Sequence, residues 1–279
     1  MAKLKPRHKR DIRVAVGKIR LFLNKKRYHP RRNVLSDMVI FGLVSKAVKV
    51  AQAAVCLVDA GLPEEAFGLS RTLVEIALSL RFITNRYTER RARRFAFYVA
   101  KWKMQMMRRM LDLKSPDQQA QQQQPKYTKA QLRKLMPDYK LMVKLARRFP
   151  KSPSAHWSEV RRGTRRSNTR TLAFEADGHE KLNGKPIDWA FDYEWIYAWT
   201  SQYVHATAAC MESHFTGPSE VFRVHVAPDR NRGIDGTAVF NIALYLYKIL
   251  KMAFPVIGES FPEKLSTPLE RILTEMVKE

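Results

Sequence analysis

The stretch from Phe67 to Phe82, FGLSRTLVEIALSLRF, constrains the fold more than any other part of the chain. Leucine and isoleucine recur at helical spacing on one side, and the opposite side is largely apolar too, which predicts a helix buried all round. Arg71 and Glu75 interrupt this pattern at a spacing that lets them pair on one face. Because burying an unpaired charge costs several kcal/mol, we expect the pair to find a third polar partner from another segment.

The stretch from Ile187 to His214 is the best source of that partner, because it is predicted to form a second long helix. Polar side chains follow one another there at intervals of one helical turn: Tyr193, Tyr197, Ser201 and His205. These side chains share one side of the helix. We expect Glu75 to accept a hydrogen bond from His205 or a tyrosine, and Arg71 to face a small pocket that suits an anion. The alternative is an internal polar network that only fixes the packing of the two helices.

Other apolar stretches predict the rest of an all-α fold. A helix from Asn33 or Ser36 to Asp59 should end at Gly61, and Pro63 should begin the next helix, so that the two form a hairpin. Further helices are expected over Gly236–Phe254 and Glu263–Glu279. We predict a helical bundle of about six or seven helices at residues 34–260, followed by a C-terminal helix at residues 261–279. Residues 221–226 could form a short strand or an extended loop.

The chain is strongly basic, with 51 Lys and Arg against 26 Asp and Glu, a formal charge of +25 and a pI near 10.3. Residues 1–33 form a basic N-terminal arm, in which Ile12, Val16 and Ile19 predict an amphipathic helix that ends before Pro30. This arm could contact nucleic acid or acidic lipid, or act as a flexible solubilising arm. A mitochondrial-type presequence is a minor alternative.

A basic, Gln-rich insertion occupies the middle of the sequence. A cluster of arginines opens a helix whose aromatic and methionine stripe suits either a core or nucleic-acid stacking: Arg90, Arg91, Arg93 and Arg94. Residues 115–125 read as a Gln-rich linker. Residues 150–170 read as an Arg-rich surface loop whose side chains could contact phosphates: Arg161, Arg162, Arg165 and Arg166.

These features predict a polyanion as partner, with RNA favoured over DNA and an anionic membrane surface as a further option. A basic surface that only keeps the protein soluble is the competing interpretation. Lys46 and Lys49 interrupt the best candidate for a membrane span, so we expect no transmembrane helix. Cys56 and Cys210 lie in apolar patterns and are expected to be core thiols in a reducing cytoplasm. No cofactor fingerprint or metal-ligand spacing occurs, and the oligomeric state is not indicated.

Short motifs carry a resemblance to a known family. The helix that ends at Gly61, the RTLVE step from Arg71 to Glu75, the basic helix at residues 94–103 and YAWTSQYVHA at residues 197–206 are similar to an uncharacterised, mainly bacterial helical family catalogued as domain of unknown function 5677. The resemblance covers residues 39–254. It implies an all-helical fold with a polar signature and no established activity; the signature is Arg71, Glu75, Ser201 and His205.

The chain is also similar in general pattern to the HEPN superfamily of helical ribonucleases and toxins. Its members carry an arginine that is followed, after four to six residues, by a histidine, and no arginine of this chain has that spacing to a histidine.

Three functions follow as hypotheses. The first is a nucleic-acid-binding protein, most simply an RNA binder acting as a defence or stress effector. The second is a nuclease or other phosphoester hydrolase, with His205 as general acid or base, Glu75 orienting it, Arg71 stabilising charge and Ser201 nearby. The third is a non-catalytic interaction module whose polar core is structural.

Overall fold

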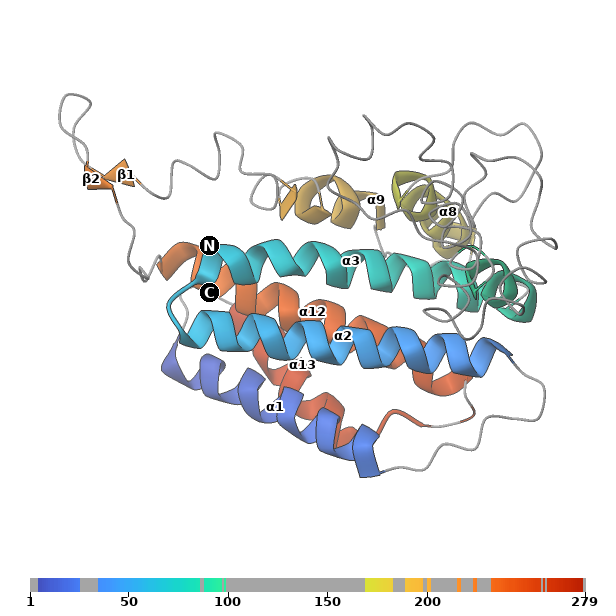
Figure 1. The fold of residues 1–279 in the computed structure, drawn as a ribbon, viewed down its shortest axis with the longest axis horizontal. Coiled ribbons are helices and arrows are strands. Elements are labelled where there is room, and N and C mark those ends of the chain that lie inside the picture. Colours follow the sequence, from blue (N-terminus) through green and yellow to red (C-terminus); the bar gives the residue numbers. More distant parts are fainter. Residues whose placement is uncertain are drawn as a thin grey trace, which may run out of the picture. The chain divides into compact units, whose positions relative to one another are not determined.

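The computed structural model describes residues 5–25, 35–85, 88–96, 98, 169–182, 189–197, 200–201, 215–216, 223–224, 232–256, 258 and 260–277. The chain divides into two compact units. Residues 1–88 and 169–279 form the first unit, and residues 89–168 form the second. The architecture below is that of the first unit, which contains every labelled element (Figure 1).

Three long helices form the centre of this unit and contact one another: α2 (Leu35–Asp59), α3 (Pro63–Asn85) and α12 (Arg232–Val256). In Figure 1 they lie side by side with α3 and α2 crossing in front of α12. Their shared interior consists of aliphatic side chains that are almost completely shielded from solvent, including Ile40, Leu73, Leu78, Leu80, Ile242 and Leu246. Burial of this apolar surface is the main source of stability in such a bundle.

The α2–α3 hairpin forms where the sequence predicts it. Gly61 adopts a positive φ of 78°, which favours glycine, and the amide of Leu62 donates a hydrogen bond to the carbonyl of Leu57 at 2.9 Å. Pro63 then occupies the first turn of α3, followed by Glu64 and Glu65. Acidic side chains there complement the positive end of the helix dipole. The end of one helix and the start of the next are therefore encoded locally.

α2 and α12 are also long and apolar enough to cross a membrane, by length and composition. About half of the relevant window is buried within the bundle in each helix, 50% in α2 and 56% in α12. A core helix of a globular protein has the same length and composition, so these properties alone assign neither helix to a bilayer.

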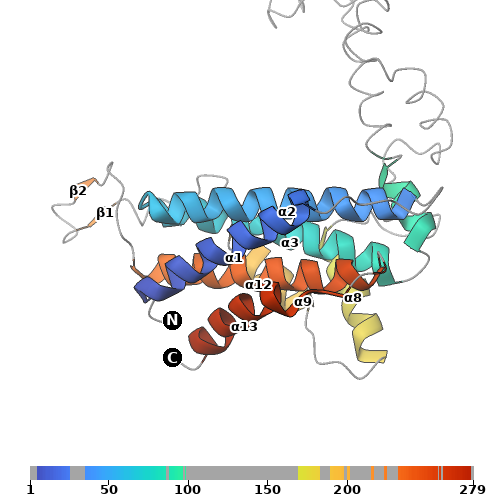
Figure 2. The same ribbon diagram turned by 90° about the horizontal axis from the view of Figure 1, so that it is seen from below.

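On one side of this centre lie α1 (Pro6–Lys25) and α13 (Glu263–Val277), which Figure 2 shows in front of α2 and α12. The apolar face of α1 is buried against these neighbours, with Ile12 and Ile19 at most 1% exposed. The expected amphipathic helix in the basic N-terminal stretch is thus a packed part of the bundle.

Ion pairs fix α1 in place. Arg13 pairs with Asp59 at 2.7 Å, and Lys9 with Asp235 at 2.7 Å. The buried His8 accepts from the Lys5 amide at Nδ1, at 3.4 Å, which leaves the proton on Nε2 to donate to Glu275 at 3.0 Å. This hydrogen bond lowers the pKa of the Glu275 carboxyl. Several of the basic residues of α1 are therefore structural.

On the other side of the centre, three short elements cover α3: α8 (Thr169–Leu182), α9 (Trp189–Phe191) and the π-helix η1 (Asp192–Tyr197). Two two-residue strands, β1 (Phe215–Thr216) and β2 (Arg223–Val224), form a small antiparallel pair. The second strand falls within the stretch 221–226 that alternation had predicted. In the second unit, the described residues 89–96 are helical.

The all-α fold is confirmed, and the helices predicted around residues 36–59, 63–82, 236–254 and 263–279 are all present. No helix was predicted between the Arg-rich loop at residues 150–170 and the helix expected from Ile187, so α8 was missed. Leu172, Ala173 and Ala176 are buried at helical spacing and would have indicated it. Cys56 was expected in the core but is exposed, because α2 turns that position to solvent; Cys210 lies outside the described residues.

The packing of α1 can be tested by substitution. Ile19→Ala should lower the free energy of unfolding by about 2–5 kcal/mol, because it leaves a cavity at a fully buried position. Leu21 on the same helix is 52% exposed, so Leu21→Ala should change the free energy of unfolding by less than about 0.5 kcal/mol. Urea denaturation measures both. Equal effects at the two positions would contradict this packing.

Candidate functional site

The polar face of α3 holds the ion pair that sequence analysis singled out. Arg71 Nε and Glu75 Oε1 are 3.4 Å apart, one turn apart on the helix. Their side chains are 22% and 41% exposed, whereas Leu73 and Leu78 on the same helix are fully buried. The expectation that α3 is buried all round is therefore wrong on this face, because the segment packed over it leaves Glu75 open to solvent. The pair sits at a partly open surface.

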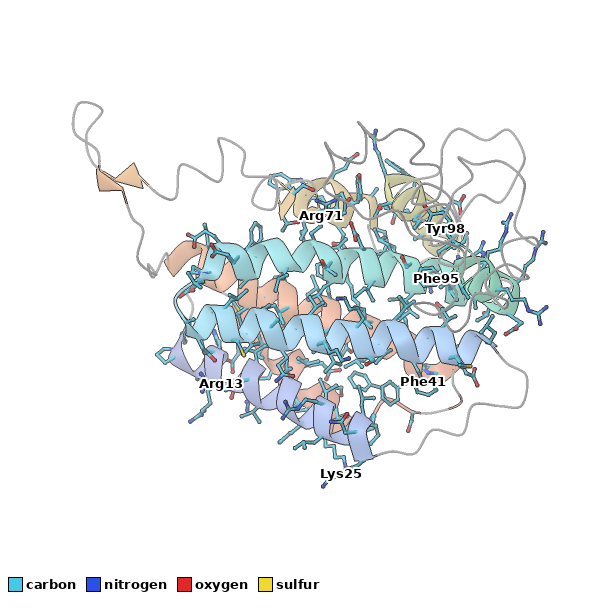
Figure 3. The ribbon with its side chains drawn as sticks, viewed as in Figure 1. Arg13, Lys25, Phe41, Arg71, Phe95 and Tyr98 are labelled. Carbon is cyan, nitrogen blue, oxygen red and sulfur yellow. The ribbon has the colours of Figure 1, made fainter. Side chains whose placement is uncertain are left out.

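Tyr197 of η1 supplies the predicted third partner. Arg71 Nη2 donates to the hydroxyl of Tyr197 at 2.9 Å, and the guanidinium carbon lies 4.7 Å from the centre of the same ring. In Figure 3, Arg71 extends from α3 on the side that faces α9 and η1. Tyr193 stacks on Tyr197 with ring centres 4.6 Å apart and planes inclined by 17°. We call these four residues, Arg71, Glu75, Tyr193 and Tyr197, the α3–η1 cluster.

The backbone of this segment differs from the regular helix that was predicted. Sequence analysis expected one α-helix from Ile187 to His214, but after α9 the chain continues as the π-helix η1. Tyr193 and Tyr197, which stack on each other, both lie in this π-helical segment. Such π segments occur frequently at functional sites.

Two carboxylates hold this segment in position. The Asp177 side chain on α8 accepts hydrogen bonds from the backbone amides of Trp189 and Ala190, the second at 2.8 Å, and so caps the start of α9. Asp192 pairs with Lys248 of α12 at 2.5 Å, with both side chains mostly buried. These contacts join α8, η1 and α12 and fix the direction in which the tyrosines point.

Aromatic rings enclose the Lys248 ammonium. Its nitrogen lies 4.8 Å from the ring centre of Trp189 and 5.3 Å from that of Tyr245. Both rings are almost completely buried. Burial, reinforced by the Asp192 carboxylate, raises the pKa of Tyr245 well above its ordinary value of 10.0, so its phenol stays protonated. Cation–π contacts and the ion pair together compensate Lys248 for its loss of water.

The phenol of Tyr193 is also kept in its neutral form. Burial raises its pKa above 10.0, and the neighbouring Tyr197 acts in the same direction, against the opposing effect of Arg170 and Arg71. A neutral phenol can donate a hydrogen bond as well as accept one. The cluster thus presents a cation, a carboxylate and a neutral phenol within a small area.

Next to this cluster, three large aromatic side chains are about half exposed: Phe174 at 49%, Phe191 at 53% and Trp195 at 55%. We call them the aromatic patch. The rings of Phe191 and Trp195 lie 5.9 Å apart, and the Arg170 guanidinium lies 5.4 Å from the ring of Phe174. Arg170 also pairs with Glu194 at 3.2 Å. Phe191 ends α9 and Trp195 lies in η1, and the sequence pattern singled out neither ring as part of a site.

The other predicted catalytic residues are only partly located. Ser201 is helical and half-buried. His205 lies outside the described residues, so its contact with Glu75 stays a prediction. Among the residues that the structure describes, no group of three His, Cys, Asp or Glu side chains is arranged to hold a metal ion.

Of the predicted nucleic-acid contacts, Arg90 and Arg93 are exposed, and Arg91 and Arg94 are half-buried. Arg93 pairs with Glu89 at 3.2 Å on the same helix. The remaining predicted contacts lie outside the described residues: Arg161, Arg162, Arg165 and Arg166.

Comparison with known protein families gives a match that covers the α3–η1 cluster. The model of a family described as a family of unknown function (DUF5677) matches residues 37–221, more than half of the chain. The chain belongs to this family. The matched region includes α2, α3, α8, α9 and η1, and with them Arg71, Glu75 and Tyr197. No curated protein and no solved structure matches the chain. The similarity to HEPN proteins stays a prediction.

Lys248→Met tests the contact that anchors η1. It should lower the free energy of unfolding by about 3–5 kcal/mol, because it leaves the Asp192 carboxylate mostly buried without its cation. A second change, Asp192→Leu, should recover much of this loss. Lys251→Met, one turn further along α12 and exposed, is the control and should have little effect. Urea denaturation distinguishes these outcomes, and equal losses at the two lysines would rule the anchor out.

Proposed function

We propose that this protein binds single-stranded nucleic acid, RNA in preference to DNA, with the aromatic patch as a stacking surface. The observation that carries the proposal is the half exposure of Phe174, Phe191 and Trp195 beside Arg170. Aromatic rings gain stability when they are buried, so three exposed rings on elements that contact one another, α8, α9 and η1, favour a surface that a ligand covers. Rings next to an arginine suit unpaired bases and their phosphates.

The charge of the chain supports the same partner. A net charge of +25 attracts a polyanion over distances greater than any single contact. Arg170 is 59% exposed and can reach a phosphate, while Glu194 beside it opposes an anion. Because RNA offers unpaired bases in loops and ends, it is the nucleic acid best suited to a stacking surface.

The α3–η1 cluster adds polar groups to this surface. Tyr193 with its neutral phenol and Arg71 behind Tyr197 can donate to phosphate or ribose oxygens. Glu75 is open enough to accept from a ribose hydroxyl. Arg161, Arg162, Arg165 and Arg166 stay predicted phosphate contacts, and replacing all four with glutamine should weaken binding and reduce its salt dependence.

Trp195→Ala should weaken binding of an unstructured oligoribonucleotide by about tenfold, the loss of one base–ring stack. Met38→Ala, which removes a 62% exposed apolar side chain from α2, is the matched control and should leave binding unchanged. Fluorescence anisotropy at several salt concentrations measures the affinity. The absence of salt-sensitive binding to single-stranded RNA, single-stranded DNA and double-stranded RNA would refute the proposal.

Charge changes at the patch should act in opposite directions. Arg170→Gln should weaken RNA binding and reduce the slope of log affinity against log salt by about one. Glu194→Gln should strengthen binding, because it removes a carboxylate that repels phosphate and frees Arg170 from its ion pair. The two variants lose side chains of the same ion pair, so a purely structural effect would shift both affinities in the same direction.

The contact of Arg71 with Tyr197 beside Glu75 supports phosphoester hydrolysis as a second candidate, in which His205 would be the acid or base. If the protein cleaves bound RNA, Glu75→Gln and His205→Ala should each reduce the single-turnover rate by about a hundredfold or more while leaving RNA affinity intact. Cleavage that persists at the wild-type rate in both variants would exclude this site.

A further inference from the structure

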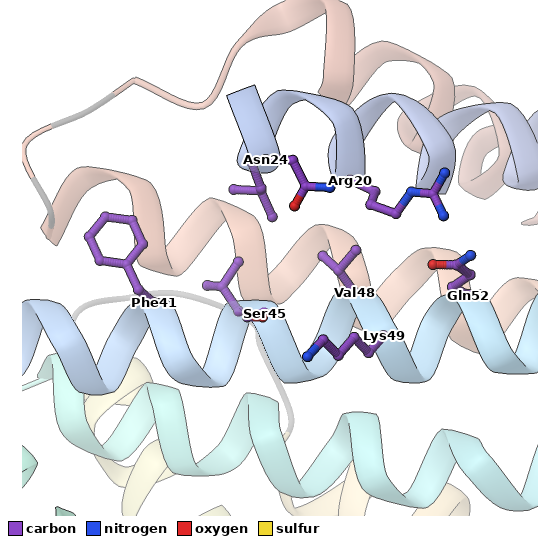
Figure 4. Close-up of a pocket in the computed structure, with 9 residues that line it drawn as sticks. Arg20, Asn24, Phe41, Ser45, Val48, Lys49 and Gln52 are labelled. Carbon is purple, nitrogen blue, oxygen red and sulfur yellow. The ribbon is translucent and has the colours of Figure 1, made fainter. Parts of the chain in front are cut away.

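The structure holds a second candidate binding site in a groove between α1 and α2, and no residue of the α3–η1 cluster or of the aromatic patch lines it. The groove has a volume of about 350 Å³ (Figure 4). Arg13 in the first half of α1 pairs with Asp59 at the end of α2, so the two helices run antiparallel. The groove lies between the last turns of α1, from Arg20 to Asn24, and the stretch of α2 from Phe41 to Gln52. Phe41 lies at one end and Gln52 at the other.

The walls of the groove are mainly apolar. Phe41, Val44 and Val48 follow one another along α2, and Leu23 faces them from α1. The distance along α2 from Phe41 to Gln52 is about 16 Å at the rise of an α-helix. A narrow, extended apolar molecule fits such a shape better than a compact one.

Two cations border the groove from opposite walls. Arg20 extends from α1 and Lys49 from α2, both exposed. Neither side chain forms an ion pair or hydrogen bond to the described residues. This contrasts with Lys9 and Arg13 earlier on α1, each of which has a carboxylate partner. Charge complementarity therefore calls for an anionic group at this groove.

We propose that the groove binds a single-chain amphiphile with an anionic head, of the fatty-carboxylate class. Its alkyl chain would lie along Val44 and Val48 towards Phe41, and its carboxylate would lie near Arg20 and Lys49. The site is separate from the aromatic patch, so it does not depend on RNA binding.

Calorimetric titration of the full-length chain with octanoate, decanoate and dodecanoate, each below its micellar concentration, tests the apolar wall. Affinity should rise by about tenfold for each pair of added methylene groups, because each one is buried on binding. Dodecan-1-ol, which lacks the charge, should bind at least about tenfold more weakly than dodecanoate. Equal affinities along the series, or for the alcohol and the acid, would overturn the proposal.

Substitutions locate the binding. Ser45→Glu places a carboxylate in the groove, one turn before Lys49, where it would pair with the cations and exclude the ligand. It should abolish dodecanoate binding, whereas Ser45→Gln should retain it. The double change Arg20→Gln and Lys49→Gln should weaken binding at least about tenfold. The control is the double change Arg10→Gln and Lys46→Gln, which removes the same charge from exposed positions outside the groove and should have no effect.

A membrane surface is the alternative partner for these cations. Sedimentation with vesicles of phosphatidylglycerol, compared with phosphatidylcholine, separates the two. If the vesicles bind the chain through Arg20 and Lys49 while dodecanoate does not bind, the groove proposal is wrong. RNA affinity should be the same in Ser45→Glu and the wild-type chain, so that failure of either proposal is seen independently of the other.

Discussion

The ion pair between Asp192 and Lys248 is the contact on which the arrangement of the candidate site depends. Asp192 begins the π-helical segment, and Lys248 lies in the middle of α12, one of the three central helices. The pair is mostly buried, so separating it would leave a charge in a poorly hydrated place. It therefore holds the wider helical turn against α12, and that turn determines that Tyr197 meets Arg71 while Trp195 stays exposed. This mostly buried ion pair thus determines which side chains of η1 are exposed at the candidate site.

The fold was largely predictable because its central helices are encoded by local patterns. α2, α3 and α12 have continuous helical periodicity, and Gly61 and Pro63 mark the boundary between the first two with residues whose backbone preferences are strong. α8 was missed because its buried positions are few and follow an Arg-rich stretch that reads as a loop. The amide groups at the start of α9 are capped by Asp177, which is distant in sequence, so no local pattern reveals that cap.

The candidate site was predictable in part, for a related reason. Two opposite charges in an apolar helix require compensation, and this requirement indicated that the second segment would supply a polar partner. The tyrosine was expected to donate to Glu75, whereas Tyr197 accepts from Arg71. The burial expected for Glu75 was too high, because the sequence does not show that the segment covering it is a short π-helix that leaves its side chain open to solvent. The exposure of Trp195 was not predictable either, since helical periodicity identifies the residues that share a face but not whether another element covers that face.

The ion pairs show which of the many cations of the chain are neutralised by carboxylates. In the first half of α1, three basic side chains are paired with carboxylates of other helices: Arg7 with Glu275, Lys9 with Asp235 and Arg13 with Asp59. Their charge is compensated locally and contributes little to attraction at a distance. Within the part of the chain that the structure describes, the cations available to a ligand are then those without a carboxylate partner, among them Arg20 and Lys49 at the groove. Net charge alone indicates that an anionic partner is favourable, whereas the pattern of pairing indicates where on the molecule it can bind.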